Sequence, residues 1–119
     1  MNKEQYIDFV ESLFKTEGFD NSLDATMHAA IGVSSEAGEL LDAIKKSWVY
    51  KKDLDYENII EELGDIEFYL QALRSQLCIR RKEVIEANYN KLTKRYPSGQ
   101  YSDEAAQARA DKYDFEKGD

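Results

Sequence analysis

The sequence predicts an all-α fold, in which four helices pack like a four-helix bundle and a short fifth helix follows at the C-terminus. Three observations support this fold class. The 119 residues include one proline, Pro97, and only six glycines. Leu, Glu, Lys and Ala, which favour helix, are frequent. Apolar residues also recur at the spacing of an amphipathic helix along most of the chain. The length predicts a single domain spanning residues 1–119.

The first helix is expected to begin at Asn2, which can form a capping box with Gln5, and to stop near Gly18. Its apolar face comprises Ile7, Val10, Leu13 and Phe14.

The second helix is expected to begin after Asn21-Ser22 and to reach about Tyr50. The side of this helix that lies opposite its main apolar stripe carries small residues above and below two carboxylates. We expect this side to leave room for a ligand. Each helical glycine costs about 1 kcal/mol relative to Ala, so we expect a close approach of another group at Gly32 and Gly38. The main apolar stripe comprises Leu23, Met27, Ala30, Ser34, Leu41, Ile44 and Trp48, and the opposite stripe comprises Gly32, Glu36, Glu39 and Ala43.

The third helix follows a polar connection and is capped by Asp53 or Asp55. Two further acidic residues, Glu62 and Asp65, flank its apolar seam. A carboxylate at the edge of a core is costly to desolvate unless a cation or hydrogen-bond donors compensate for the cost. The expected buried seam comprises Ile59, Leu63, Ile66, Leu70, Leu73 and Leu77.

The fourth helix is expected over about Arg81 to Tyr96, because Pro97 cannot continue it. Its inward-facing residues should be Val84, Ile85 and Leu92, and its polar, basic stripe comprises Asn88, Lys91 and Arg95. Ser102 should cap a short helix from Asp103 to about Tyr113, and the residues from Glu116 to Asp119 should be frayed.

The net charge of −8 and the pI near 4.7 argue against a nucleic-acid polymer as a partner, because such polymers are bound by dense Lys and Arg surfaces. A mononucleotide carried by metal ions remains compatible with this charge. Cys78 is the single cysteine, so no disulfide can form within the chain. The sequence has no long apolar run and no signal-peptide pattern, so we expect no membrane association.

Two helices each carry a pair of carboxylates at positions i and i+3, Glu36 with Glu39 and Glu62 with Asp65. This spacing places both members of a pair on one side of a helix. If the helices are antiparallel, the four groups converge, and their mutual repulsion favours a hard divalent cation such as Mg²⁺, which also binds phosphate. A single carboxylate pair of this kind usually lies on the solvent-exposed face of a helix. Here a basic stripe follows on the next helix, and the combination suits a triphosphate.

The order and content of these motifs resemble the MazG-like all-α nucleoside triphosphate pyrophosphohydrolases of bacteria and phages. The resemblance spans about residues 23–109. It rests on Gly32, Glu36-Ala37-Gly38-Glu39-Leu40, Lys45-Lys46, Glu62-Leu63-Gly64-Asp65, Tyr69-Leu70 and the tail Asn88-x-x-Lys91-Leu92-x-x-Arg95-Tyr96-Pro97.

The resemblance implies Mg²⁺-dependent hydrolysis between the α- and β-phosphates, with Mn²⁺ as a substitute ion and deoxynucleoside triphosphates as the expected substrates. It also implies a homodimer or homotetramer in the cytoplasm of a bacterium or of a phage-infected host. Glu36 or Glu39 would receive the proton of the attacking water, and the sequence does not separate the two. The implied metal ligands are Glu36, Glu39, Glu62 and Asp65, and the implied phosphate or sugar ligands are Asn88, Lys91 and Arg95.

Several of these residues have an alternative role. Lys91 and Arg95 can instead be surface residues that contribute only to solubility. His28 can contact the base or a phosphate, or it can be a half-buried core histidine. Tyr69 is a candidate for contact with the sugar or with a metal-bound water. Trp48 and Tyr50 can stack on a base, but Trp48 is expected in the core. The alternative to an enzyme is a non-catalytic helical module for nucleotide or metal binding or for oligomerisation. A di-iron bundle is disfavoured because it needs a Glu-x-x-His pair from each of two helices, and His28 is the single histidine.

Overall fold

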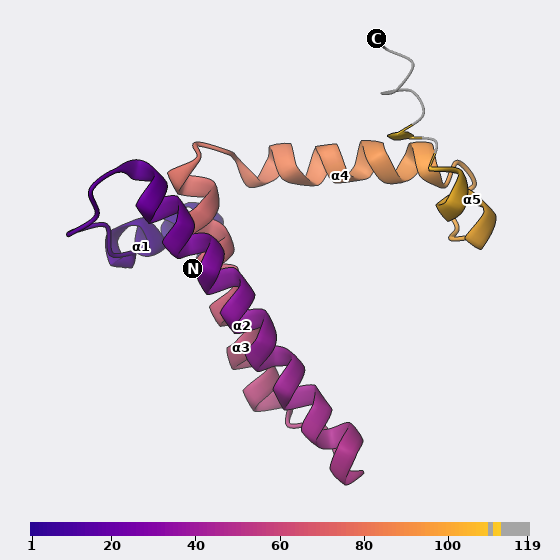
Figure 1. Cartoon of the computed structure of the whole chain (residues 1–119), viewed down its shortest axis with the longest axis horizontal. Helices are drawn as coiled ribbons and strands as arrows, with labels where there is room; N and C mark the ends of the chain where they lie inside the picture. The colour runs from indigo at the N-terminus through magenta and orange to yellow at the C-terminus, as the bar shows by residue number, and fades with distance from the viewer. Residues whose placement is uncertain (110, 113–119) are drawn as a thin grey trace. The chain divides into compact units, whose positions relative to one another are not determined.

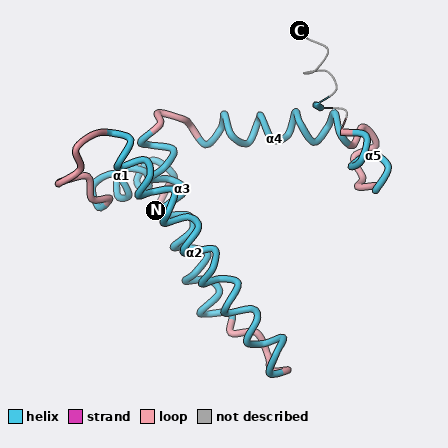
Figure 2. The backbone as a smooth tube through the Cα atoms, viewed as in Figure 1, coloured by secondary structure: helices cyan, strands magenta, loops and turns pink. Residues whose placement is uncertain are grey.

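The computed structural model describes residues 1–109, 111 and 112, and this part of the chain contains five α-helices and no strand. The predicted all-α class with a short C-terminal helix is therefore confirmed (Figures 1 and 2). The chain divides into two compact units, Met1–Ile79 and the part from Arg80 onward. That residues 1–119 form one domain stays a prediction. Over the described residues, no helix has the length and apolar character needed to cross a membrane.

The first unit consists of α1 (Lys3–Leu13), α2 (Ser22–Tyr50) and α3 (Tyr56–Gln76). The long helices α2 and α3 run antiparallel, side by side, and α1 packs against α3 (Figure 1). Their first turns are capped as the sequence predicts. The Asn2 side chain accepts from the Gln5 N–H at 2.8 Å, and those of Asn21 and Asp55 accept from the backbone three residues on at 3.1 and 3.2 Å.

Helix α1 ends at Leu13 rather than near Gly18, so its predicted end is wrong. Phe14 adopts an extended conformation, with φ −67° and ψ 120°, and its side chain is only 7% exposed. Phe14 packs in the core with Val10, which is fully buried. The chain leaves the helix at this point, and Phe14 can then be buried. Tertiary packing therefore sets the end of α1. Gly18, with φ +86°, lies in the loop that follows.

The face of α2 that packs in this unit is the one lined by small residues. Ala25, Ala29, Gly32 and Ala43 are buried. Small side chains let two helix backbones approach closely, and α3 covers this side. The larger apolar stripe predicted from the sequence is solvent-exposed instead, and placing Trp48 in the core is wrong, since it is 81% exposed. The other large members of this stripe that are exposed are Leu23, Met27, Leu41 and Ile44.

The predicted seam of α3 is only partly buried. Leu63 and Leu77, at 47% and 48% exposure, lie largely in solvent. The most buried residues of this helix are Gln71 and Ala72, which the heptad pattern did not include. The Gln71 side chain is satisfied inside the helix, since it donates to Ser75 at 3.0 Å and accepts from Arg74 at 3.0 Å. The remaining seam residues, Ile59, Ile66, Leu70 and Leu73, are half-buried.

The second unit contains α4 (Arg81–Arg95) and α5 (Asp103–Ala108). Helix α4 ends before Pro97 as predicted, and Ser102 caps α5 by accepting from the Ala105 N–H at 3.1 Å. The prediction that Val84, Ile85 and Leu92 face inward is wrong, because all three are exposed. Helix α5 is shorter than predicted, because Arg109 adopts a left-handed conformation with φ 48°. Tyr113, the expected end of this helix, lies outside the described residues. The segment 116–119, which is expected to be frayed, also lies outside them.

An ion pair between Arg95 and Asp111 fastens the segment after α5 to α4. The Arg95 Nε donates to Asp111 Oδ1 at 3.0 Å, and the two side chains are 19% and 7% exposed. Burial raises the pKa of the Asp111 carboxyl, but the hydrogen bond and the charge of Arg95 outweigh it and hold this pKa below its usual value of 3.8. Arg95 thus has a structural partner within the second unit.

We expect this attachment to be pH-dependent. A carboxylate whose pKa is lowered by folding adds stability above its unfolded pKa, near 3.8, and this contribution is lost as the pH falls through the folded pKa. NMR signals of the half-buried residues Ala105 and Ala106 should therefore change in a single titration below pH 4, and Asp111→Asn should produce the same change at neutral pH. Identical spectra of wild type and Asp111→Asn at pH 7 would contradict this interpretation.

Candidate metal and nucleotide site

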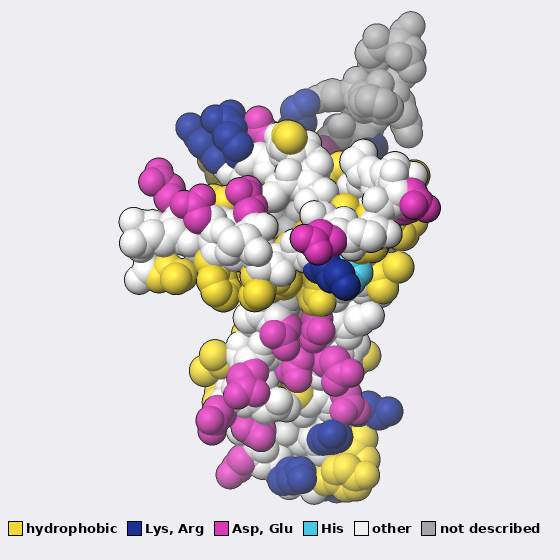
Figure 3. Space-filling view, turned by 90° about the vertical axis from the view of Figure 1, so that its left-hand side faces the viewer, with side chains coloured by type: hydrophobic (Ala, Val, Ile, Leu, Met, Phe, Trp, Pro, Cys, Tyr) yellow, Lys and Arg dark blue, Asp and Glu magenta, His cyan; other side chains and the backbone are white. Residues whose placement is uncertain are grey.

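Three carboxylates from two antiparallel helices meet in the first unit. Glu36 comes from α2, and Glu62 and Asp65 come from α3, where the i, i+3 spacing places them on one side. One oxygen atom from each of the three lies within 4.8 Å of the others. Glu36 and Glu62 are half-buried, whereas Asp65 is exposed. Figure 3 shows acidic side chains gathered on the α2–α3 pair beside a row of hydrophobic side chains.

The negative charges of this cluster act on one another. Burial raises the pKa of the Glu62 carboxyl, and the neighbouring charges of Asp65, Glu36 and Glu39 raise it further. Each of these effects disfavours the ionised carboxylate. A divalent cation would relieve the repulsion, which makes the three oxygen atoms a candidate cation site.

Glu39 lies one turn beyond Glu36 on α2, is exposed, and is outside the group of three. Its charge still contributes to the field at Glu62. The structure thus gathers three of the four acids expected as ligands and leaves Glu39 at the edge of the cluster. The assignment of Glu39 as a ligand or a proton acceptor stays a prediction.

Tyr69 lies next to the cluster because Gly32 has no side chain. A Cβ atom at the buried Gly32 would overlap the Tyr69 ring, so the glycine admits the ring at this point. The Tyr69 ring also meets Phe68 edge-on, with centroids 5.2 Å apart and planes at 87°. These contacts hold Tyr69 where α2 and α3 meet.

His28 lies in an aromatic group rather than among the acids. Its ring centroid is 5.2 Å from that of Phe14, 5.6 Å from that of Phe19 and 6.1 Å from that of Tyr69. The side chain is exposed, which differs from the half-buried core position considered from the sequence. A role for His28 in substrate binding stays a prediction.

A pocket of about 470 Å³ adjoins the carboxylate cluster. Besides Glu36 and Asp65 it is lined by aromatic and aliphatic side chains, several of which come from α1. The lining residues are Tyr6, Phe9, Leu13, Glu36, Gly64, Asp65, Phe68 and Tyr69.

Sequence reasoning missed the contribution of α1 to this pocket. Tyr6, Phe9 and Leu13 recur at i, i+3 and i+7, which places them on one face of the helix. Placing Leu13 on the core-facing side with Val10 is wrong, since Leu13 is 60% exposed and lines the pocket. The recurrence of Tyr6 and Phe9 with Leu13 was the available signal. Burial raises the pKa of the Tyr6 phenol, and the charges of Glu67 and Asp65 raise it further, whereas the charge of Arg74 lowers it. The net effect is a raised pKa, so Tyr6 carries its proton at neutral pH.

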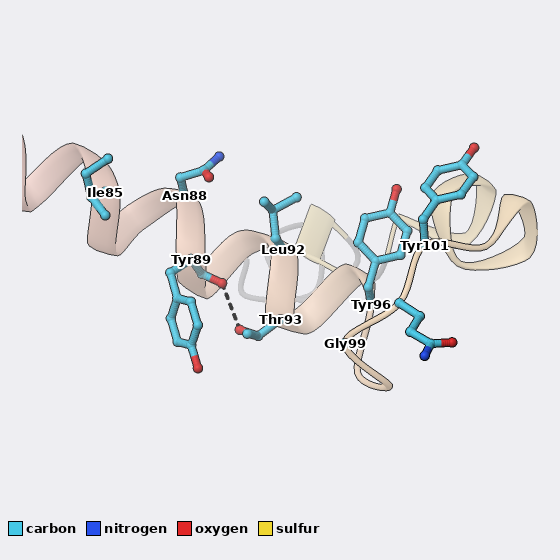
Figure 4. A pocket seen from close by; sticks show the side chains of 9 residues that line it. Ile85, Asn88, Tyr89, Leu92, Thr93, Tyr96, Gly99 and Tyr101 are labelled. Atoms are coloured by element: carbon cyan, nitrogen blue, oxygen red, sulfur yellow. Dashed lines mark hydrogen bonds between the residues drawn. The ribbon is translucent and has the colours of Figure 1, made fainter.

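The predicted phosphate ligands belong to the second unit. Asn88 and Lys91 are exposed on α4, and Arg95 bonds to Asp111. Asn88 also lines a hollow of about 480 Å³, in which the Tyr96 and Tyr101 rings lie 5.4 Å apart (Figure 4). Among the described residues, no carboxylate lines this hollow. Its lining residues are Ile85, Asn88, Tyr89, Leu92, Thr93, Tyr96, Gly99, Gln100 and Tyr101.

Comparisons with known proteins agree with this picture. A family model described as the MazG nucleotide pyrophosphohydrolase domain matches residues 25–100. The chain is also similar to the "Gene 37 protein" of Mycobacterium phage L5, with 27% identity over 92 residues, which cover 74% of this chain and 81% of that protein. No solved structure matches the chain significantly. The matched region contains all three clustered carboxylates.

Proposed function

This chain belongs to the MazG nucleotide pyrophosphohydrolase family, and from that premise we propose that it hydrolyses nucleoside triphosphates, deoxynucleoside triphosphates foremost, to the monophosphate and pyrophosphate with Mg²⁺ as the cofactor. The observation that carries this proposal is the convergence of Glu36, Glu62 and Asp65 from two helices. Mn²⁺ is the expected substitute ion.

The three carboxylates fit a hard divalent cation. With Mg–O bonds of about 2.1 Å, two ligand oxygens of an octahedral ion lie roughly 3–4 Å apart. The carboxylate oxygens here already lie within 4.8 Å of one another, so small side-chain rotations would bring them to bonding distance. The donor set is all oxygen and anionic, which is the set that Mg²⁺ and Mn²⁺ prefer.

The bound ion would hold the triphosphate and offset the negative charge that develops on it. Water would attack the α-phosphorus, and the bond from this phosphorus to the bridging oxygen of the β-phosphate would break, so that pyrophosphate leaves. Glu36 lies in the cluster, whereas Glu39 lies outside it with its carboxylate exposed. We therefore assign Glu39 as the acceptor of the proton from the attacking water.

Asn88 and Lys91 are retained as proposed ligands of phosphate or sugar oxygens, on the basis of the family resemblance and their exposed positions. Arg95 is the weaker candidate, because its guanidinium is engaged with Asp111. Replacing Lys91 by Ala should raise KM without changing the affinity for the metal ion alone. Tyr69, which lines the pocket beside the cluster, is the proposed contact for the sugar.

We also propose that the active protein is a homodimer or homotetramer. Large apolar side chains are exposed along the side of α2 that faces away from α3, including Leu23 at 67%, Leu41 at 67% and Trp48 at 81% exposure. Such exposed apolar stripes mark interaction surfaces. A second copy of the chain would cover them.

Light scattering at micromolar protein concentration should therefore give two or four times the 13.7 kDa mass of the chain. Trp48→Asp should shift the mass toward the monomer, because it places a charge on the exposed stripe. Circular dichroism should show unchanged helix content, since Trp48 makes little contact within the unit. A monomeric wild type would refute the oligomer.

The catalytic proposal is tested by incubating the purified chain with each common NTP and dNTP and Mg²⁺ and identifying the products. Monophosphate and pyrophosphate in equal amounts are expected. Glu39→Gln should lower kcat by about 10²–10⁴-fold while retaining metal affinity. Tight binding of metal and nucleotide without any product would instead indicate the non-catalytic binding module.

A further inference from the structure

We propose that the pocket between α1 and α3 is the nucleoside subsite of the enzyme and that Phe9 is the platform on which the base of the substrate stacks. This inference rests on the proposed function, because it takes the substrate to be a nucleoside triphosphate. It assigns a role in base binding to α1, which lies outside the matched region 25–100.

The lining of the pocket combines two kinds of chemistry. Glu36 and Asp65, two of the three clustered carboxylates, line it. Tyr6, Phe9 and Phe68 supply aromatic surface. A ligand that fits both kinds of lining carries an anionic group, held through a cation, next to an uncharged planar ring. A nucleoside triphosphate has this composition.

The size and accessibility of the pocket also suit a nucleoside. Its volume of about 470 Å³ lies within the range of about 300–1,000 Å³ typical of small-molecule sites. Gly64 lines the pocket between the two acidic residues of α3, and a Cβ atom there would meet nothing within 4 Å. The chain therefore leaves open space immediately beside the carboxylates.

The Phe9 side chain does not anchor α1 in the core and is largely open to solvent. It is 47% exposed, whereas α1 is anchored by Val10 at 0% and Phe14 at 7% exposure. The Phe9 ring is tilted by 30° from that of Tyr6, with centroids 6.4 Å apart. A large aromatic face that the core does not use, on the wall of a pocket that also holds Asp65, is available to stack on a ligand ring.

The test uses the full chain and compares Phe9→Ala, Phe9→Leu and Phe9→Trp, with Tyr56→Ala as the control. Tyr56 is an aromatic residue that is 69% exposed at the start of α3 and lines neither the pocket nor the cluster. Base stacking predicts that Phe9→Ala raises KM for all dNTPs by about 5- to 150-fold, with a smaller effect on kcat. Phe9→Trp should restore KM, Phe9→Leu should lie between, and Tyr56→Ala should match the wild type.

Two further measurements separate base binding from a general structural effect. The affinity for Mn²⁺ alone and the inhibition constant of inorganic triphosphate, which has no base, should be the same in Phe9→Ala and in the wild type. A KM for Phe9→Ala within twofold of the wild type overturns the subsite. An equal weakening of inorganic triphosphate binding also overturns it.

Failure of the proposed function would look different. If the wild type releases no pyrophosphate from any nucleotide, the hydrolase assignment fails, and the subsite is then judged by calorimetric binding of a non-hydrolysable α,β-methylene dNTP. Weaker binding by Phe9→Ala than by Tyr56→Ala supports the subsite. Equal binding by the two variants overturns it.

Discussion

Glu36→Gln is expected to lower nucleoside triphosphate hydrolysis by more than about 100-fold. Glu36 is the only member of the carboxylate cluster that α2 supplies, so the cluster cannot enclose a cation from both helices without it. Loss of a partner that only supports a metal ligand typically costs about 10- to 100-fold, and loss of a ligand itself should exceed that range. The measurement is pyrophosphate release at saturating Mg²⁺.

The same variant should separate lost chemistry from lost folding. Gln keeps the shape of Glu but removes one of three repelling charges, so the metal-free Glu36→Gln protein should unfold at the same or a higher temperature than the wild type. Mg²⁺ should raise the Tm of the wild type by mass action and leave that of Glu36→Gln nearly unchanged. Glu61→Gln, an exposed neighbour outside the cluster, is the matched control and should behave as the wild type.

Gly32→Ala is expected to destabilise the fold by up to about 2 kcal/mol. Inserting atoms into a packed site costs about 1–3 kcal/mol, and here the added Cβ would overlap the Tyr69 ring. The ring has little room to move, because it packs edge-on against Phe68. The gain of about 1 kcal/mol from replacing a helical glycine by Ala offsets only part of this cost. Urea unfolding followed by circular dichroism measures the difference.

Gly38→Ala and Gly64→Ala are the matched controls for this prediction. A Cβ atom at either position meets nothing within 4 Å, so each variant should gain up to about 1 kcal/mol from helix propensity. The close approach that the sequence led us to expect at Gly38 is therefore absent within the described chain, whereas that at Gly32 is confirmed. If Gly32→Ala were as stable as Gly38→Ala, the Tyr69 contact would not matter for folding.

Local signals predicted much of the fold and of the candidate site. Side-chain caps at Asn2, Asn21 and Ser102 and the stop before Pro97 act over a few residues, so they can be read directly from the sequence. The i, i+3 spacing of Glu62 and Asp65 likewise fixes their common side of α3. Their meeting with Glu36 then followed from the antiparallel arrangement of two long helices with a short connection.

The remaining features depend on tertiary contacts that periodicity does not contain. Helix α2 has two stripes, and the pattern favoured the larger one as the packed side. The structure packs α3 on Ala29 and Gly32, because close backbone approach needs small residues, and leaves Trp48 exposed. The end of α1 is set by the burial of Phe14, and Phe9 faces the pocket only because α1 lies against α3.

We propose that Glu36, Glu62 and Asp65 together bind a divalent cation that holds the triphosphate. A crystal structure of the chain with Mn²⁺ and a non-hydrolysable α,β-methylene dNTP tests it most directly, because Mn²⁺ can be located by its anomalous scattering. We predict an anomalous peak about 2.1 Å from an oxygen of each of these three residues and in contact with the phosphates. Nucleotide bound without a peak between α2 and α3, or an ion held only by other residues, would contradict the claim.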